Sequence, residues 1–261
     1  MTIASRVAPA LRGLSGFAVV VVVWEFLSRA EIVNPAFLPP ASVVLLRLGE
    51  LAVDPPFLRH VLATMQAWAI GLLVSAAVAI VLGVLLGSSR AAYAASRALI
   101  EFLRPIPSVA LIPLAILLFG RGTQMKVSLI IYASVWPILF NTIYGMHDVD
   151  PVAKDTARSF GFGRLQILAR VALPSAMPFI YTGVRIASAV ALILAVSAEL
   201  IGGGALGLGV FIQVAQTTGG RPDLVLAGTI VAGLLGWAIN QASIVAERRF
   251  LGWQPALRAR A

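Results

Sequence analysis

Cysteine is absent from this chain, and charge is scarce. Its 261 residues include no cysteine, two histidines and only 12% charged residues, whereas soluble domains carry about 25%. Disulfide bonds and thiolate metal sites are therefore excluded. Because 59% of the residues are hydrophobic, the apolar surface exceeds what one aqueous core can bury, and lipid is the predicted solvent.

Catalytic and nucleotide-binding patterns are also missing. The sequence has no Gly-Lys pair and hence no P-loop for ATP. His60 and His147 are far apart, and no carboxylate–histidine group has metal-ligand spacing. The net charge is +9, but the basic stretches lack both interleaved aromatics and a nucleic-acid motif. These absences argue against an enzyme, against a metal or cofactor held by this chain, and against a nucleic-acid partner.

Six apolar segments stand out, and a helix needs ~20 residues to cross ~30 Å of hydrocarbon. The first follows Arg6 and Arg12 as a secretory signal would, but no small-x-small cleavage site comes after it, so we expect an uncleaved span. The third is short and contains Pro105, Pro107 and Pro113, which favours a helix beside a polar cavity. The segments are residues 11–27, 62–87, 105–119, 127–144, 179–200 and 224–246.

The sequence therefore predicts an all-α membrane protein with about six transmembrane helices. Residues 1–261 form one transmembrane domain in this interpretation, since no internal repeat or separate soluble domain is evident. Between the first two spans, the apolar-rich residues 43–52 lie among prolines, and we expect a short helix along the outer interface.

Basic residues are distributed unevenly between the loops. With both termini in the cytoplasm, the inner segments hold thirteen Lys and Arg residues, Arg104 among them, and the outer segments hold six, including Lys126, with Arg185 left inside the fifth span. The positive-inside rule favours this orientation. It makes residues 146–178 a long cytoplasmic loop and residues 247–261 a cytoplasmic tail.

The long loop has the pattern of a helical hairpin. Residues 152–160 place small or apolar side chains on one helical face and charged ones opposite. Gly161 suits a left-handed helix end, and a second helix follows until Pro174 is expected to stop it. From the residues alone, a hairpin that only links two spans at the membrane surface and a docking hairpin remain equally open.

The loop resembles the "EAA" loop of binding-protein-dependent ABC importer permeases, whose pattern is Glu-Ala-Ala, three residues, Gly, nine residues, Ile-x-Leu-Pro. The equivalents here are Asp155-Thr156-Ala157, Gly161 and Val171-Ala172-Leu173-Pro174. Asp for Glu, Thr for Ala and Val for Ile are departures that keep charge sign or small apolar character. Residues 103–114 also resemble the third-span signature of the sulfonate/nitrate/taurine branch, and the resemblance extends over about residues 14–257.

This resemblance implies a type I ABC importer permease of the bacterial inner membrane, without its own ATPase activity. The implied partners are two cytoplasmic ABC ATPases that bind ATP and Mg, a second copy of this chain, and a periplasmic or lipid-anchored binding protein. The implied substrate is a small anion, with aliphatic sulfonate first and nitrate, taurine or bicarbonate next; a vitamin precursor is the alternative. The residues it assigns to ATPase coupling are Asp155, Thr156, Ala157, Arg158, Gly161, Leu173 and Pro174.

Further residues are candidates for the translocation pathway or its gate. Arg185, about six residues inside the fifth span, either extends to the cytoplasmic interface or faces the pathway. Glu199 is expected near the outer surface, as part of a gate or as a contact for the binding protein. Glycines after the fifth span give the outer loop backbone freedom. The candidates are Glu199, Arg185, Pro107, Pro113, Gly207 and Gly209.

Two rival classes make different demands on the sequence. A secondary transporter driven by an ion gradient usually carries inverted repeats and intramembrane acidic residues. A membrane-embedded enzyme needs clustered His, Asp or Glu at one membrane face. Neither pattern is evident in this chain.

Overall fold

The structure is a computed structural model that describes residues 3–250, with side chains for residues 15–249. This part of the chain is helical and contains no strand. The elements are α1 (Ile3–Arg29), α2 (Ala41–Leu51), α3 (Pro55–Ser88), α4 (Arg90–Leu103), the 3-10 turn η1 (Ser108–Leu111), α5 (Ile112–Phe119), α6 (Thr123–His147), α7 (Pro151–Ser159), α8 (Arg164–Ile167), the π-helical turn η2 (Leu168–Ala172), α9 (Leu173–Gly202), α10 (Leu208–Gly219) and α11 (Pro222–Phe250).

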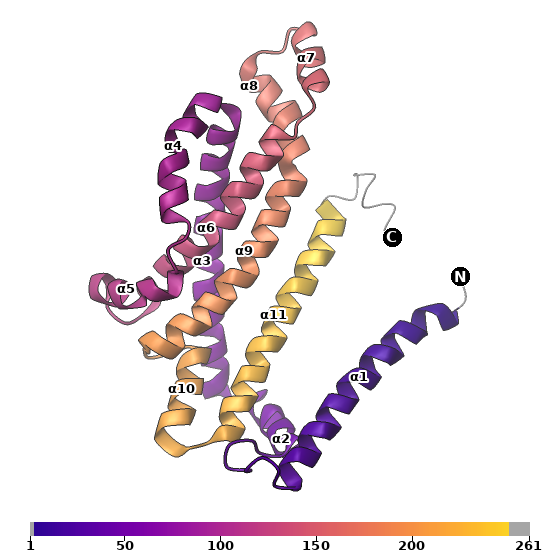
Figure 1. Ribbon diagram of the computed structural model, residues 1–261, viewed down its shortest axis with the longest axis vertical. Helices are drawn as coiled ribbons and strands as arrows, with labels where there is room; N and C mark the ends of the chain where they lie inside the picture. The colour runs from indigo at the N-terminus through magenta and orange to yellow at the C-terminus, as the bar shows by residue number, and fades with distance from the viewer. Residues whose placement is uncertain (1–2, 251–261) are drawn as a thin grey trace.

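Three long helices, α3, α6 and α9, form the centre of the molecule (Figure 1). The α7–α8 hairpin projects from one end of this centre, and α2 and α10 lie at the opposite end. Helix α11 packs beside α9, whereas α1 leans outward and contacts the rest of the described chain mainly through α2. Both ends of the centre therefore carry separate small elements that are available to partners.

Small residues let the central helices approach closely. Along α3, side chains turned inward recur about every fourth residue and include Ala67, Gly71, Ala79 and Gly83. A Cβ added to Gly71 would lie 2.5 Å from Ile130, and one added to Gly83 would lie 2.5 Å from Thr142. In lipid, the hydrophobic effect contributes little to helix association, because lipid tails are as apolar as the side chains. Close packing between the helices is what stabilises their association.

The predicted spans are confirmed where the apolar run is long. The described chain has four helices long and apolar enough to cross a membrane: α3, α6, the continuous helix from Arg164 to Gly202, and α11. Helix α1, which covers the predicted first span, has 27 residues. The predicted surface helix at residues 43–52 corresponds to α2.

The third predicted span, residues 105–119, is wrong as drawn from the sequence. Only eight of its residues form α5, which is ~12 Å of helix at 1.5 Å per residue and too short to cross. Helix α4 precedes it, and α4 together with η1 and α5 has the length and hydropathy of one span but is bent by 76°. Pro105 and Pro107 lie at the break, where proline cannot continue a helical hydrogen-bond ladder.

Pro174 does not end the second hairpin helix, in contrast to the prediction. The helix continues from α8 through η2 into α9. In η2 the Leu173 N–H donates to the Leu168 carbonyl, five residues earlier. This π-type turn shifts the hydrogen-bond pattern directly before Pro174, so the proline enters at the first turn of α9, where its missing N–H is tolerated.

Candidate coupling and gating sites

Helix α7 is a short helix with well-formed ends. Asp150 caps its start, with the carboxylate accepting a hydrogen bond from the Val152 N–H at 2.8 Å, and Pro151 occupies the first turn. At the other end Gly161 has φ +82°, and the Phe162 N–H donates to the Ala157 carbonyl at 3.1 Å. A Cβ on Gly161 would meet no atom within 4 Å. The backbone conformation, not space, therefore requires glycine here.

The outward side of the hairpin combines charge with apolar groups. Asp155 and Arg158 form an ion pair of 2.5 Å, with both side chains about two-thirds exposed. Val152, Phe160 and Leu165 are also exposed, at 68%, 78% and 76%. The hairpin therefore exposes large apolar side chains beside an ion pair, as interaction surfaces often do. Of the predicted apolar face, only Ala157 is buried.

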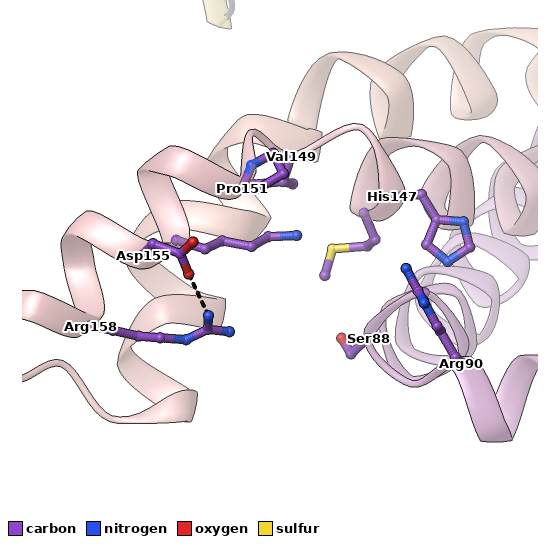
Figure 2. Close-up of a pocket in the computed structure, with 10 residues that line it drawn as sticks. Ser88, Arg90, His147, Val149, Pro151, Asp155 and Arg158 are labelled. Carbon is purple, nitrogen blue, oxygen red and sulfur yellow. Dashed lines mark hydrogen bonds and ion pairs between the residues drawn. The ribbon is translucent and has the colours of Figure 1, made fainter.

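A basic groove separates α7 from the corner between α3 and α4. It encloses about 660 Å³, and Figure 2 shows Arg90 and His147 on one side and Asp155 and Arg158 on the other. Lys154 also lines the groove. The Asp155 carboxylate is already engaged by Arg158, so the groove has an excess of positive charge.

Leu173 and Pro174, the last residues of the predicted coupling set, lie away from this outward surface. Leu173 packs against a buried cluster that includes Met146, Val149 and Ala176. Both residues belong to the first turn of α9. They lie where the hairpin joins the central helices.

At the opposite end of the molecule, Glu199 is completely buried. Its carboxylate accepts hydrogen bonds from Lys126 Nζ at 2.9 Å, from Thr64 Oγ1 at 2.8 Å and from the Gly209 N–H at 2.9 Å. Lys126, expected in an outer loop, has a side chain only 4% exposed. Glu199 is therefore not at the surface in this structure, because a neighbouring helix supplies its counter-charge.

The loop between α9 and α10 is bound to the same cluster. Lys126 Nζ also donates to the Leu206 carbonyl at 3.1 Å, and the Leu208 N–H donates to Thr64 Oγ1 at 2.8 Å. Gly207 has φ +151°, and a Cβ there would overlap the Glu199 carboxylate. Gly207 and Gly209 are thus held by close approach to Glu199, while the loop as a whole joins α3, α6, α9 and α10. We call Thr64, Lys126, Glu199 and the 206–209 backbone the outer polar cluster.

The other candidate pathway residues lie elsewhere. Arg185 ties α9 to α11, with its guanidinium 3.3 Å from both Asn240 Oδ1 and Glu247 Oε2. Pro107 is exposed at the break after α4, and Pro113 is exposed in the first turn of α5. The structure therefore brings Glu199, Gly207 and Gly209 together and leaves Arg185, Pro107 and Pro113 apart from them.

Comparison with known sequences identifies the family of this chain. A sequence model described as "Binding-protein-dependent transport system inner membrane component" matches residues 79–250, which is more than half of the chain. The chain belongs to this family. The match includes the whole α7–α8 hairpin and the residues of the EAA-like pattern.

Curated relatives of this permease span most of its length. The taurine transport system permease protein TauC of Escherichia coli is 32% identical over 241 residues, covering 90% of this chain and 87% of its own. The nitrate import permease protein NrtB of Leptolyngbya laminosa is 30% identical, with 86% and 81% covered. The bicarbonate transport system permease protein CmpB of Synechococcus elongatus is also 30% identical, with 79% and 71% covered.

Among solved structures, inward-facing conformations of the MetNI methionine ABC transporter resemble this permease. One chain matches with a TM-score of 0.61 at 18% identity, covering 75% of this permease and 98% of that chain. At this identity the likeness concerns the fold alone. The permease is therefore a multi-pass membrane protein with the all-α, type I ABC importer fold.

Sequence reasoning missed two residues of the outer polar cluster, Thr64 and Lys126, and the adjoining His60. His60 Nδ1 lies 3.1 Å from the nitrogen and 2.9 Å from the carbonyl oxygen of Gly207. One signal was available, since Lys126 directly precedes one apolar run and Glu199 ends another. Two antiparallel spans would bring these charges to the same end of the molecule.

Proposed function

We propose that this permease is the membrane-spanning subunit of an ATP-driven importer for a small anion that a binding protein delivers. Its relatives are named for taurine, nitrate and bicarbonate, which differ in size but share a compact group of acceptor oxygens. Aliphatic sulfonate is the first candidate, followed by nitrate, taurine and bicarbonate. Selection among them belongs mainly to the binding protein.

The observation that carries this proposal is the exposed surface of the α7 hairpin. A capped helix that presents an ion pair beside Val152, Phe160 and Leu165 fits a groove on another protein. Its basic flank suits acidic side chains, because opposite charges across an interface set orientation and speed association. We assign this partner as the ATPase, which binds ATP and Mg in place of this chain.

The assembly in this proposal contains two copies of the permease, two cytoplasmic ATPases and a periplasmic or lipid-anchored binding protein. Each permease is one transmembrane domain of the bacterial inner membrane. The hairpin and both termini face the cytoplasm, and the outer polar cluster lies beneath the binding protein. Closure of the ATPases then moves α7, and the continuous helix from α8 to α9 connects that motion to Glu199 at the far end.

The test uses the assembled complex in proteoliposomes and a pair of glycine variants. Gly161→Val forces a β-branched residue into φ +82°, a left-handed conformation that L-residues disfavour by about 1–2 kcal/mol or more. Gly163→Val is the matched control, because Gly163 has φ −71° and ψ 165°. Gly161→Val should reduce ATP-driven uptake of taurine or an alkanesulfonate at least tenfold, while Gly163→Val stays near the wild type.

Membrane insertion and ATPase binding are measured on the same samples. The coupling assignment requires that Gly161→Val still inserts but loses ATPase co-purification or uptake. Full uptake by that variant would remove the assignment. Uptake by the permease alone, without ATP or an ATPase, would favour an ion-gradient transporter instead.

A further inference from the structure

One side of α4 carries charge that the single chain leaves exposed. Arg97, Glu101 and Arg104 follow one another at intervals of four and three residues, and this spacing places them on the same helical side. Arg97 and Glu101 form an ion pair of 2.7 Å with side chains 65% and 62% exposed. Ile100, three residues after Arg97, is buried in a cluster that includes Ala79 of α3 and Ile138 of α6, so the charged row borders the packed side of α4.

Contacts with α6 place Arg104 at membrane depth. Tyr132 Oη donates to the Leu103 carbonyl at 2.6 Å, and the Arg104 guanidinium lies 4.5 Å from the centre of the Phe140 ring. At about 1.5 Å per residue, Tyr132 lies ~13 Å from the start of α6 and Phe140 ~10 Å from its end. Arg104 therefore does not lie in a cytoplasmic loop, as its place in the sequence predicted.

Arg104 differs from the other cations at this depth. Lys126 is paired with Glu199, and Arg185 with Glu247. Within residues 15–249, no ion pair is formed by Arg104. A charged side chain inside a membrane faces protein or water rather than hydrocarbon. The exposed side of α4 therefore borders a polar passage or a partner.

A second donor lies on the same side of α6. Trp136 occurs midway between Tyr132 and Phe140, at four-residue steps, and its Nε1–H is buried without a hydrogen-bond partner among the described residues. A buried donor is rarely left unpaired. Arg104 and Trp136 thus offer N–H groups, and the nearby Tyr132 hydroxyl is already used. A ligand with anionic oxygens supplies hydrogen-bond acceptors for these two N–H donors.

We propose that Arg104 forms an anion-binding step in a water-filled passage along the exposed side of α4, at the break before η1. The planar guanidinium stacked on Phe140 presents its N–H edge to an oxyanion, and Trp136 donates once the break opens. The Arg97–Glu101 pair, one to two turns away, is neutral and leaves the net positive charge at Arg104. This proposal rests on the proposed function and names a residue that would contact the substrate.

The absence of cysteine makes a direct test possible. R104C is reconstituted with the ATPase and binding protein and is treated with cationic or anionic methanethiosulfonate reagents. R104C should lower ATP-driven anion uptake at least tenfold. The cationic reagent should restore at least a third of it, because it returns a positive charge, whereas the anionic reagent should not. R104K should retain more uptake than R104Q, and Arg121→Gln, in the exposed α5–α6 connection, is the matched control.

Binding-protein-stimulated ATP hydrolysis separates this step from coupling. We expect R104Q to keep hydrolysis within twofold of the wild type while uptake falls. If the wild-type complex takes up the anion and R104Q takes it up equally well, the role of Arg104 is overturned and the proposed function is not. A wild-type complex without ATP-driven anion uptake would instead overturn the proposed function. Failure of R104Q to dimerise, or a defect that follows the anionic lipid content of the vesicles, would reassign Arg104 to a subunit or a lipid contact.

Discussion

At the scale of single residues, the pair of Lys126 and Glu199 is the one ion pair among the described residues in which both side chains are buried. Both side chains are withdrawn from solvent, so desolvation offsets much of their mutual attraction. Loss of one partner is different, because it leaves a buried charge without compensation at a cost of about 3–5 kcal/mol. The pair therefore fixes the position of the 206–209 loop more than it adds net stability.

A double-mutant cycle tests this view. Lys126→Met should strongly lower the unfolding midpoint of the detergent-purified permease, since the buried Glu199 carboxylate would lose its counter-charge. Glu199→Gln should do the same for Lys126. The double variant should be more stable than the sum of the single losses implies, by roughly 1–3 kcal/mol. Thermal unfolding followed by fluorescence measures all four proteins, and strictly additive losses would contradict the pairing.

At the scale of elements, the contact between α3 and α6 depends on residues that lack a side chain. Gly71 and Gly83 face Ile130 and Thr142 at the same offset along the two helices, so the helices run parallel and in register. Any larger residue must separate them. Overpacking of this kind typically costs about 1–3 kcal/mol, and more where the backbone cannot shift.

Gly83→Leu should therefore reduce the yield of folded permease and its thermal stability. Gly233→Leu in α11 provides the control, because a Cβ at Gly233 meets no atom within 4 Å and this position is exposed. Size-exclusion profiles before and after heating measure both. Equal behaviour of the two variants would mean that the close approach of α3 and α6 is not required.

Most long helices could be predicted because length and hydrophobicity are local properties of the sequence. Helices α3, α6, α9 and α11 each contain an apolar run that identifies them. Helix α4 was missed because Arg97, Glu101 and Arg104 interrupt its apolar pattern, and α10 because it follows a glycine-rich loop. The continuation through Pro174 depends on a π-type turn that leaves no clear sequence signal.

The candidate site residues also divide into those that the local sequence predicts and those that it does not. Gly161 was predictable, since a glycine after an amphipathic helix indicates a left-handed end. The partners of Glu199 were not, because Thr64 and Lys126 lie 135 and 73 residues away in the chain. Pairing at that separation depends on helix packing, which no local pattern encodes.

At the scale of the whole molecule, the described chain leaves much apolar surface uncovered. In α1, Phe17, Val20 and Phe26 are each more than 60% exposed. The contacts of α1 to the segment just before α2 are specific, with Trp24 Nε1 donating to the Pro39 carbonyl at 3.0 Å and Ser28 Oγ to the Leu38 carbonyl at 2.7 Å. Lipid and a second copy are the two environments that suit such a helix.

Orientation in the membrane is also a property of the whole molecule. The count of basic residues, corrected for the positions of two of them in the structure, supports the predicted orientation. Removing Arg104 from the inner segments and Lys126 from the outer ones leaves twelve basic residues inside and five outside, so the positive-inside bias persists. Ser159, the last residue of α7, and Thr218, in the last turn of α10, are both exposed, and the two helices lie at opposite ends of the molecule (Figure 1). Because the chain lacks cysteine, Ser159→Cys and Thr218→Cys are each the only thiol in the permease. A membrane-impermeant maleimide should label Thr218→Cys in intact spheroplasts and Ser159→Cys only after permeabilisation, with the unmodified chain as the blank. Labelling of Ser159→Cys from outside would invert the topology and place α7 beyond the reach of a cytoplasmic ATPase.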